Sequence, residues 1–186
     1  VDQFVDRTIA RDSSFFGNGC VAHVSFADPV SPLLVGHLAA AAAAENIKFH
    51  RGGTYLAMEG PQFSTLAEST LYRQWGCDVI GMTNMPEAKL AREAELCYAT
   101  VAMITDYDSW HAEFGSVEVS KVIEMLMSNA EQARKLIQRV SSILPREHEP
   151  CPIGSDRALE HAIITAKEAR DPALVAKLKA VAGRIL

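Results

Sequence analysis

The sequence predicts an α/β fold in which helices flank a mixed or mostly parallel β-sheet. Strand-like and helix-like segments alternate along the chain, which is typical of this class. Residues 97–105 form a nearly continuous apolar run, as expected of a central strand covered on both faces. Between Val119 and Val140, apolar residues recur at helical spacing and predict one long amphipathic helix.

The composition is that of one compact domain. The chain has 186 residues, of which 48% are apolar and 22% are charged, so it can bury a sizeable core. Its net charge of −5 argues against a non-specific binder of nucleic acids or of membrane surfaces. The longest unbroken apolar stretch, Leu38 to Ala44, is too short to cross a bilayer.

The cysteines and the N-terminus indicate a reducing, cytoplasmic setting. None of the four cysteines forms a Cys-x-x-Cys pair, which argues against a zinc site and a thioredoxin-type motif. The first residues carry charges rather than the apolar block of a signal peptide. Because Val1, Phe4 and Val5 already follow the pattern of a fold interior, we expect the chain to be a fragment or one half of a nicked protein.

The first half of the chain contains two predicted strands and two predicted helices. We expect strands at Gly19–Phe26 and Ile47–Met58, the second with a bulge or bend at Gly52-Gly53. Ser31 followed by Pro32 is typical of a helix start, and that helix runs to about Asn46. Thr65-Leu-Ala-Glu68 is a capping box, which predicts a helix that ends before Gly76.

The second half continues the alternation. Asp78–Gly81 is a short buried strand, and a helix covers Pro86 to about Ala94. After the Cys97–Thr105 strand, the long helix begins near Ser116. A polar link over Pro145–Pro152 leads to two C-terminal helices, the first capped by Ser155 or Asp156 and the last starting at Asp171-Pro172.

The first candidate site follows the predicted strand at Asp78–Gly81. Ligands of open α/β folds collect outside the carboxyl ends of the strands. The helix that starts near Pro86 offers free N–H groups to an anion there, and Thr83 adds a hydroxyl donor. The alternative is that Thr83 or Asn84 only caps this helix.

The second candidate site is Thr105-Asp106-Tyr107-Asp108, directly after the apolar run. In extended chain, residues two positions apart point to the same side, so Asp106 and Asp108 lie together. Like charges held close favour retention of a proton on one carboxyl group, which makes a proton donor. The alternative is a solvated loop, in which aspartate is common.

The third candidate site is Glu59-Gly-Pro-Gln-Phe-Ser64, which joins a strand to a helix. The Gly-Pro turn places Phe63 where an aromatic ring can stack on a purine. The alternatives are a core phenylalanine at Phe63 and a helix cap at Ser64. No histidine pair has the spacing of metal ligands, and neither a phosphate-binding Walker loop nor a dinucleotide glycine motif is present.

Taken together, these stretches resemble the trimeric purine nucleoside phosphorylase family. The resemblance covers residues 1–144 as the C-terminal part of a single nucleoside phosphorylase domain, and residues 145–186 form a helical C-terminal extension. The motifs that carry it are Asp2–Thr8, Glu59–Ser64, Gly76–Glu87, Ala91–Ala94, Tyr98-Ala99 and Thr105–Trp110.

The resemblance implies a role for each candidate residue. Phosphate is held by Thr83, and Met82 lies against the ribose. The base is bordered by Phe63, with Asp106 and Asp108 on the N7 and amino side of adenine. The remaining expected contacts are with the 5′ substituent: Val119 and Val122 on the long helix, and His23, which closes the pocket of a neighbouring subunit.

Two residues imply a preference within the family. Family members that act on 6-oxopurines carry glutamate and asparagine where this chain has Ser64 and Asp106. A carboxylate accepts a hydrogen bond from a 6-amino group but not from a 6-oxo group, which favours adenine. A buried hydrogen-bonding group that is left without a partner costs on the order of 1–3 kcal/mol. An apolar Val119 suits an apolar 5′ substituent better than a hydroxyl.

The implied function is therefore that of a pentosyltransferase. The expected reaction is phosphorolysis of 5′-methylthioadenosine to adenine and 5-methylthioribose 1-phosphate, with Asp106 as the proton donor to N7. Inorganic phosphate is a co-substrate, and neither a metal nor an organic cofactor is expected. The alternatives are a phosphorylase for adenosine or methylthioinosine, and a non-catalytic nucleoside-binding fragment.

The sequence departs from the family pattern at the phosphate site. The N-terminal half of the family supplies a Gly-rich phosphate loop, an Arg-His pair and a small-residue base loop, and none of these is present here. We expect them on a removed N-terminal segment or on a separate chain. The resemblance also implies a homotrimer whose active sites lie at subunit interfaces.

Overall fold

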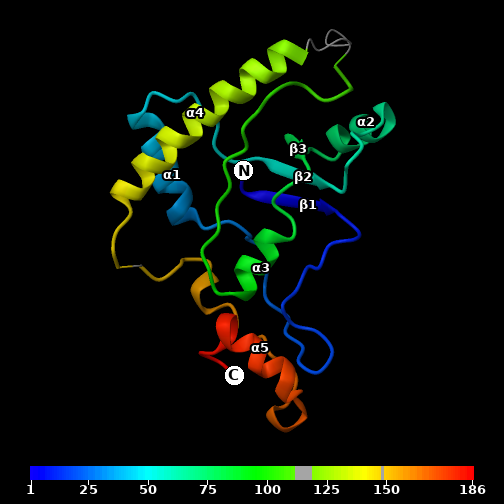
Figure 1. The fold of residues 1–186 in the computed structure, drawn as a ribbon, viewed down its shortest axis with the longest axis vertical. Coiled ribbons are helices and arrows are strands. Elements are labelled where there is room, and N and C mark those ends of the chain that lie inside the picture. Colours follow the sequence, from blue (N-terminus) through cyan, green and yellow to red (C-terminus); the bar gives the residue numbers. More distant parts are fainter. Residues whose placement is uncertain (112–118, 148) are drawn as a thin grey trace.

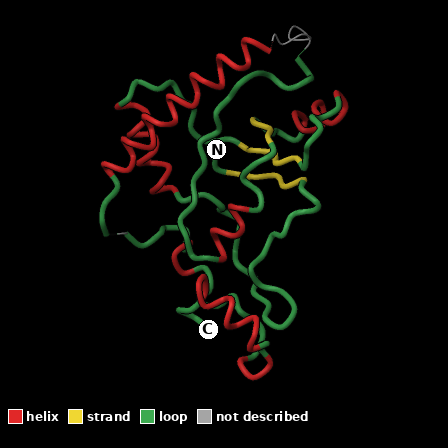
Figure 2. Tube along the Cα trace, viewed as in Figure 1, coloured by secondary structure: helices red, strands yellow, loops and turns green. Residues whose placement is uncertain are grey.

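The computed structural model describes residues 1–111, 119–147 and 149–186, and it has the predicted α/β character (Figures 1 and 2). Its sheet has three strands in the order β1-β2-β3: β1 is Gln3–Arg7, β2 is Thr54–Met58 and β3 is Val79–Gly81. All pairings are parallel, with Gln3 opposite Thr54 and Tyr55 opposite Val79. The carboxyl ends of the three strands therefore meet at one edge.

Helices surround this sheet. The connections between strands hold α1, Pro32–Ala44, and α2, Leu66–Gln74. Downstream of β3 come α3, Glu87–Glu93, the long α4, Val119–Ile143, two single 3₁₀ turns and α5, Pro172–Ala182. Helices α1 and α4 lie side by side, where Ala41 and Ala42 pack against Leu136 and Val140 (Figure 1). The small alanine side chains let the two helices approach closely.

The predicted helix starts are confirmed where local chemistry determines them. Ser31 accepts a hydrogen bond from the Leu34 N–H, and Asp171 accepts one from the Leu174 N–H. The capping box of Thr65 and Glu68 is complete, since each side chain accepts from the backbone N–H of the other. The start of α4 near Ser116 lies outside the described residues.

The prediction of a strand at Gly19–Phe26 is wrong. The backbone here makes only one-residue bridges, and one of them joins it to the C-terminal segment: the His23 N–H donates to the Ala162 carbonyl, and the Val21 carbonyl accepts from the Ile164 N–H. Gly19 has a φ of 104°, which interrupts extended backbone. This segment and α5 share a small core of their own, built on Phe16, Cys20, Leu159, Ala162, Leu178 and Ala182.

The prediction of a central strand at Cys97–Thr105 is also wrong for the described residues. The Tyr98 carbonyl accepts from the Ser31 N–H, and the Ile104 carbonyl accepts from the Asn129 side chain, so neither belongs to a ladder. Val101 and Ile104 are 44% and 56% exposed, contrary to cover on both faces. The segment runs between α4 and the sheet (Figure 1).

Two further predictions need adjustment. The strand expected over Ile47–Met58 begins only at Thr54, because Gly52 and Gly53 both adopt positive φ and turn the chain. A Cβ atom at Gly53 would lie 2.9 Å from the Asp78 carboxylate. Neither Ser155 nor Asp156 caps a helix, since the 3₁₀ turn Ser155–Arg157 follows Gly154 and has no side-chain cap.

Among the described residues, no helix combines the length and the apolar character that crossing a membrane requires.

Candidate functional site

The candidate site lies at the edge where the three strands end. Thr8 follows β1, Glu59 follows β2 and Met82 follows β3. Because the strands are parallel, the loops that carry Phe63 and Thr83 leave the sheet at this same edge. The structure thus brings the first and third predicted sites together.

Arg11 ties the three loops to one another. Its guanidinium Nη1 donates to the Met82 carbonyl at 2.9 Å and to the Met85 carbonyl at 2.5 Å. Nη2 donates to the Glu59 carbonyl at 2.9 Å and to the Met58 carbonyl at 3.4 Å. The side chain is only 22% exposed, so these bonds form largely away from water. Neither β1 nor the role of Arg11 beyond it was predicted from the sequence, although the apolar Phe4 and Val5 are a signal for this strand.

Glu59 links the loop after β2 to the chain that follows β1. Its carboxylate accepts hydrogen bonds from the backbone N–H groups of Ile9 and Ala10, and it forms an ion pair with Arg11 at 3.5 Å. The Ile9 N–H contributes most to holding the pKa of Glu59 below its ordinary value. The carboxylate thus stays charged and holds the chain beyond β1 against the loop beyond β2.

Tyr55 fixes the loop that carries Thr83. Its hydroxyl lies 3.1 Å from Thr83 Oγ1 and accepts from the Thr83 N–H at 3.4 Å. Tyr55 is 5% exposed, whereas Thr83 is exposed and therefore available to a ligand. A Cβ atom at position 81 would lie 2.0 Å from the Tyr55 hydroxyl oxygen, so this contact requires Gly81.

Asn84 supports the same loop from beneath and does not cap α3. It is 4% exposed, and its Oδ1 lies 2.9 Å from the Tyr98 hydroxyl and 2.7 Å from Thr100 Oγ1. Burial, with the nearby Glu87 carboxylate, raises the pKa of Tyr98, which keeps this hydroxyl protonated. The N-cap of α3 is Pro86, without a side-chain hydrogen bond, so the alternative of a cap at Thr83 or Asn84 is wrong.

Phe63 and Ser64 occupy the loop before α2. Phe63 is 86% exposed, which rules out the alternative that it is a core residue. Ser64 is not the helix cap either, because Thr65 is, and Ser64 Oγ lies 3.7 Å from Met58 Sδ. Met82 packs against this loop, since its sulfur would lie 2.7 Å from a Cβ atom at Gly60.

Asp106 and Asp108 lie in a turn next to the far end of α2. The guanidinium of Arg73, near the end of that helix, sits 3.8 Å above the ring of Trp110. Asp106 is exposed and accepts from Thr105 Oγ1 at 2.5 Å, whereas Asp108 is half-buried. Phe63 precedes the opposite end of α2, so the described residues place the carboxylates and the aromatic ring at the two ends of one helix.

The remaining predicted residues lie away from the strand ends or outside the described residues. Val119 and Val122 belong to the first turn of α4, and their side chains fall outside the described residues. His23 lies in the segment beside α5, in a hollow that it shares with Phe26, Lys89 and Glu93. Within a single chain it is not part of the strand-end site.

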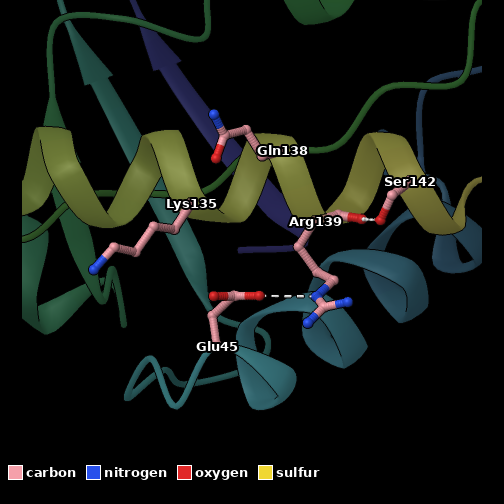
Figure 3. A pocket seen from close by; sticks show the side chains of 5 residues that line it. All are labelled: Glu45, Lys135, Gln138, Arg139 and Ser142. Carbon is pink, nitrogen blue, oxygen red and sulfur yellow. Dashed lines mark hydrogen bonds and ion pairs between the residues drawn. The ribbon is translucent and has the colours of Figure 1, made fainter.

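A second hollow lies between the end of α1 and α4, away from the strand ends. Figure 3 shows that Arg139 points toward Glu45, with 2.8 Å between Nε and the carboxylate, and that Lys135, Gln138 and Ser142 complete the lining. Its walls are surface side chains of two packed helices, and we assign it no ligand. The part of the chain that the structure describes contains no group of three His, Cys, Asp or Glu side chains able to hold a metal ion.

A parallel sheet flanked by helices, with loops tied together at its carboxyl ends, places the protein in the α/β class. The family model of the phosphorylase superfamily matches residues 1–142, and the chain belongs to this family.

Individual relatives give a more specific comparison than the family model. The chain is 68% identical to an S-methyl-5′-thioadenosine phosphorylase of Bradyrhizobium diazoefficiens and 61% identical to one of Cereibacter sphaeroides, each over 186 residues. These alignments cover 100% of this chain and 64% of each relative, so the chain spans less than two thirds of their length.

Two solved structures extend the comparison. A methylthioadenosine phosphorylase from an antarctic soil metagenomic library superimposes with a TM-score of 0.89 at 44% identity, covering 97% of this chain and 63% of that one. An adenosine/methylthioadenosine phosphorylase variant from Schistosoma mansoni, in complex with adenine, gives 0.76 at 28% identity, covering 91% and 66%.

Proposed function

We propose that the chain is part of an enzyme that converts 5′-methylthioadenosine and phosphate to adenine and 5-methylthioribose 1-phosphate. The observation that carries this proposal is identity of 61–68% along the whole chain to relatives named for that activity. The site geometry is in keeping with it, because an exposed hydroxyl and an exposed aromatic ring stand at one edge of the parallel sheet.

In this proposal, the strand-end loops hold phosphate and sugar. Thr83 donates its hydroxyl to phosphate, supported by the fixed Tyr55 hydroxyl beside it. Met82 lies against the ribose. The other phosphate ligands come from a segment outside residues 1–186, and the reaction uses neither a metal nor an organic cofactor.

The base occupies the space between Phe63 and the aspartate turn. The glycosidic bond loosens first and leaves an oxocarbenium-like sugar. Asp106 donates a proton to N7, so that adenine leaves as a neutral molecule, and Asp108 accepts from the 6-amino group. Ser64 stands where family members that act on 6-oxopurines carry a glutamate, which agrees with adenine as the base. Phosphate, already aligned, then captures the anomeric carbon.

The 5′-methylthio group lies against Val119 and Val122 in this proposal. His23 reaches the site of a neighbouring subunit in a homotrimer. Its position apart from the strand ends of its own chain is compatible with that role. The enzyme works in the cytoplasm, in keeping with four cysteines that are all free thiols.

Adenosine is the second candidate substrate. A structural neighbour from Schistosoma mansoni is named for both adenosine and methylthioadenosine. The two substrates differ only at the 5′ position, where a hydroxyl replaces an apolar methylthio group. An apolar wall distinguishes such a pair only modestly, by about 10–200-fold.

The experiment is adenine release by the whole enzyme, with its polypeptide composition first established by intact mass spectrometry. We expect release from methylthioadenosine only when phosphate is present, and less efficient release from adenosine and methylthioinosine. Thr83→Val should raise the KM for phosphate, whereas Thr70→Val, on the exposed side of α2, should not. Nucleoside binding without any phosphate-dependent release would instead identify a non-catalytic binding protein.

A further inference from the structure

Two thiols meet at a polar cluster that the proposed reaction does not use. Cys97 begins the segment that leads to Asp106, and Cys151 lies in the C-terminal region beyond the residues that match the family. The Tyr98 carbonyl, next to Cys97 in the chain, accepts from the Ser31 N–H at 2.8 Å, and each thiol shifts the pKa of the other. Both are also beside the buried Ser31, whose Oγ lies 3.8 Å from Cys151 Sγ.

We propose that Cys97 and Cys151 form an oxidisable dithiol, which hydrogen peroxide converts to an intrachain disulfide. This disulfide would join the segment before Asp106 to the C-terminal region. A disulfide requires two cysteines held close together, which most cysteine pairs of a folded chain are not, and both of these cysteines lie at Ser31. Neither Cys20 nor Cys77 is part of this cluster.

The surroundings of Cys151 stabilise a thiolate. Burial alone raises its pKa, but hydrogen bonds from the Ser155 hydroxyl and from the N–H groups of Ser155 and Ile153 outweigh burial and lower the pKa to about 7. The guanidinium of Arg92, itself 4% exposed, adds a favourable charge. Burial and the neighbouring Cys151 raise the pKa of Cys97. Cys97 therefore keeps its proton when Cys151 is a thiolate.

The exposure of the two cysteine residues sets the order of steps. Cys97 is partly exposed, whereas Cys151 is 1% exposed, so peroxide meets Cys97 first. The Cys151 thiolate takes the proton from Cys97, and the Cys97 thiolate then attacks one peroxide oxygen. A sulfur–oxygen bond forms and the oxygen–oxygen bond breaks, which leaves a sulfenic acid and hydroxide. This hydroxide takes the proton back from Cys151 and becomes water.

Cys151 then completes the bond. Its thiolate attacks the Cys97 sulfur, the sulfur–sulfur bond forms, and the hydroxyl group departs as hydroxide, which takes a proton from solvent. Overall, two thiols lose two electrons and the hydrogen peroxide is reduced by two electrons. The low pKa of Cys151 suits it to both steps, first as base and then as attacking thiolate.

The test is disulfide mapping on the whole protein. The protein is treated with a small excess of hydrogen peroxide, free thiols are blocked with N-ethylmaleimide, and the digest is analysed by mass spectrometry. We expect a cross-linked peptide pair containing Cys97 and Cys151, the loss of two of the four free thiols of this chain, and full reversal by dithiothreitol.

Matched variants separate this pair from general oxidation. Cys77→Ser should leave the cross-link intact, because Cys77 is also partly exposed but lies outside the cluster. In Cys97→Ser the cross-link disappears, and Cys151 stays reduced. The proposal is overturned if Cys97 of the native protein goes to sulfinic acid without a cross-link, or if Cys97 and Cys151 remain free while Cys77 is oxidised. Because the mapping is done on the native protein, a variant that fails to fold does not decide the result.

Discussion

Replacing Arg11 by alanine is the sharpest test of how the strand-end site is held together. The guanidinium donates to four backbone carbonyls, and three of these bonds are 2.9 Å or shorter. At a net 0.5–1.5 kcal/mol for each bond, the three short ones together contribute roughly 3 kcal/mol. We therefore expect Arg11→Ala to lower the free energy of unfolding by about 3 kcal/mol.

The assay is urea-induced unfolding of the whole protein, followed by circular dichroism. Arg7→Ala is the matched control, because Arg7 lies at the end of β1 but is exposed. We expect the control to stay within about 0.5 kcal/mol of the native protein, as surface substitutions usually do. Arg11→Lys should fall between the two, because a lysine cannot donate in the forked geometry of a guanidinium.

The same variant links stability to the site. Since Arg11 holds the loops of Phe63 and Thr83 in place, its loss should raise the KM for phosphate and for nucleoside together. An Arg11→Ala protein whose stability matches that of Arg7→Ala would refute the reasoning, because it would show that the four carbonyls are as well satisfied by water.

Four further outcomes are expected. Asp106→Asn should lower kcat for methylthioadenosine by about 10²–10⁴-fold while the KM for phosphate changes little; near-full turnover would remove Asp106 from proton transfer. Val119→Thr should shift the ratio of kcat/KM values toward adenosine, and an unchanged ratio would place the 5′ pocket elsewhere. His23→Ala should raise the KM for methylthioadenosine but not for phosphate, and a fully active monomer in sedimentation would contradict the shared site. Burial opposes ionisation of Glu95, but hydrogen bonds from Arg184 and a backbone N–H lower its pKa below 4.5, so its stabilising contribution is present above that pH and is lost on acidification. Unfolding measured between pH 7 and pH 3 should therefore depend less on pH in Glu95→Gln, and equal slopes would exclude this contribution.

Local chemistry made the helix starts predictable from the sequence. Ser31, Thr65 and Asp171 each cap a helix, because a cap depends on one side chain and an N–H group three residues away. The meeting of Thr83 and Phe63 at one edge was also predictable, since parallel strands place their carboxyl ends together.

Strands and long-range contacts were harder to predict. The apolar run at Cys97–Thr105 has the composition of a buried strand, but a strand needs a partner, and in the described residues its carbonyls bond to Ser31 and Asn129 instead. Arg11 and Tyr55 were missed for a similar reason. Their contacts span 28–74 positions of sequence, and no short motif marks such pairs.

The C-terminal region illustrates how distant contacts determine the position of a residue with a predicted role. The match to the family ends at residue 142, yet the Ala162 carbonyl accepts from the His23 N–H, and Thr165 Oγ1 accepts from the Val21 N–H. The Glu95 carboxylate accepts from the Leu159 N–H and pairs with Arg184, which fastens the same region to the end of α3. The segment around His23 makes only one-residue bridges and no strand, so its position depends on these contacts. It follows that substitutions in this C-terminal region, far from the strand ends, should weaken the contact of His23 with the nucleoside of a neighbouring subunit before they weaken the contact of Thr83 with phosphate.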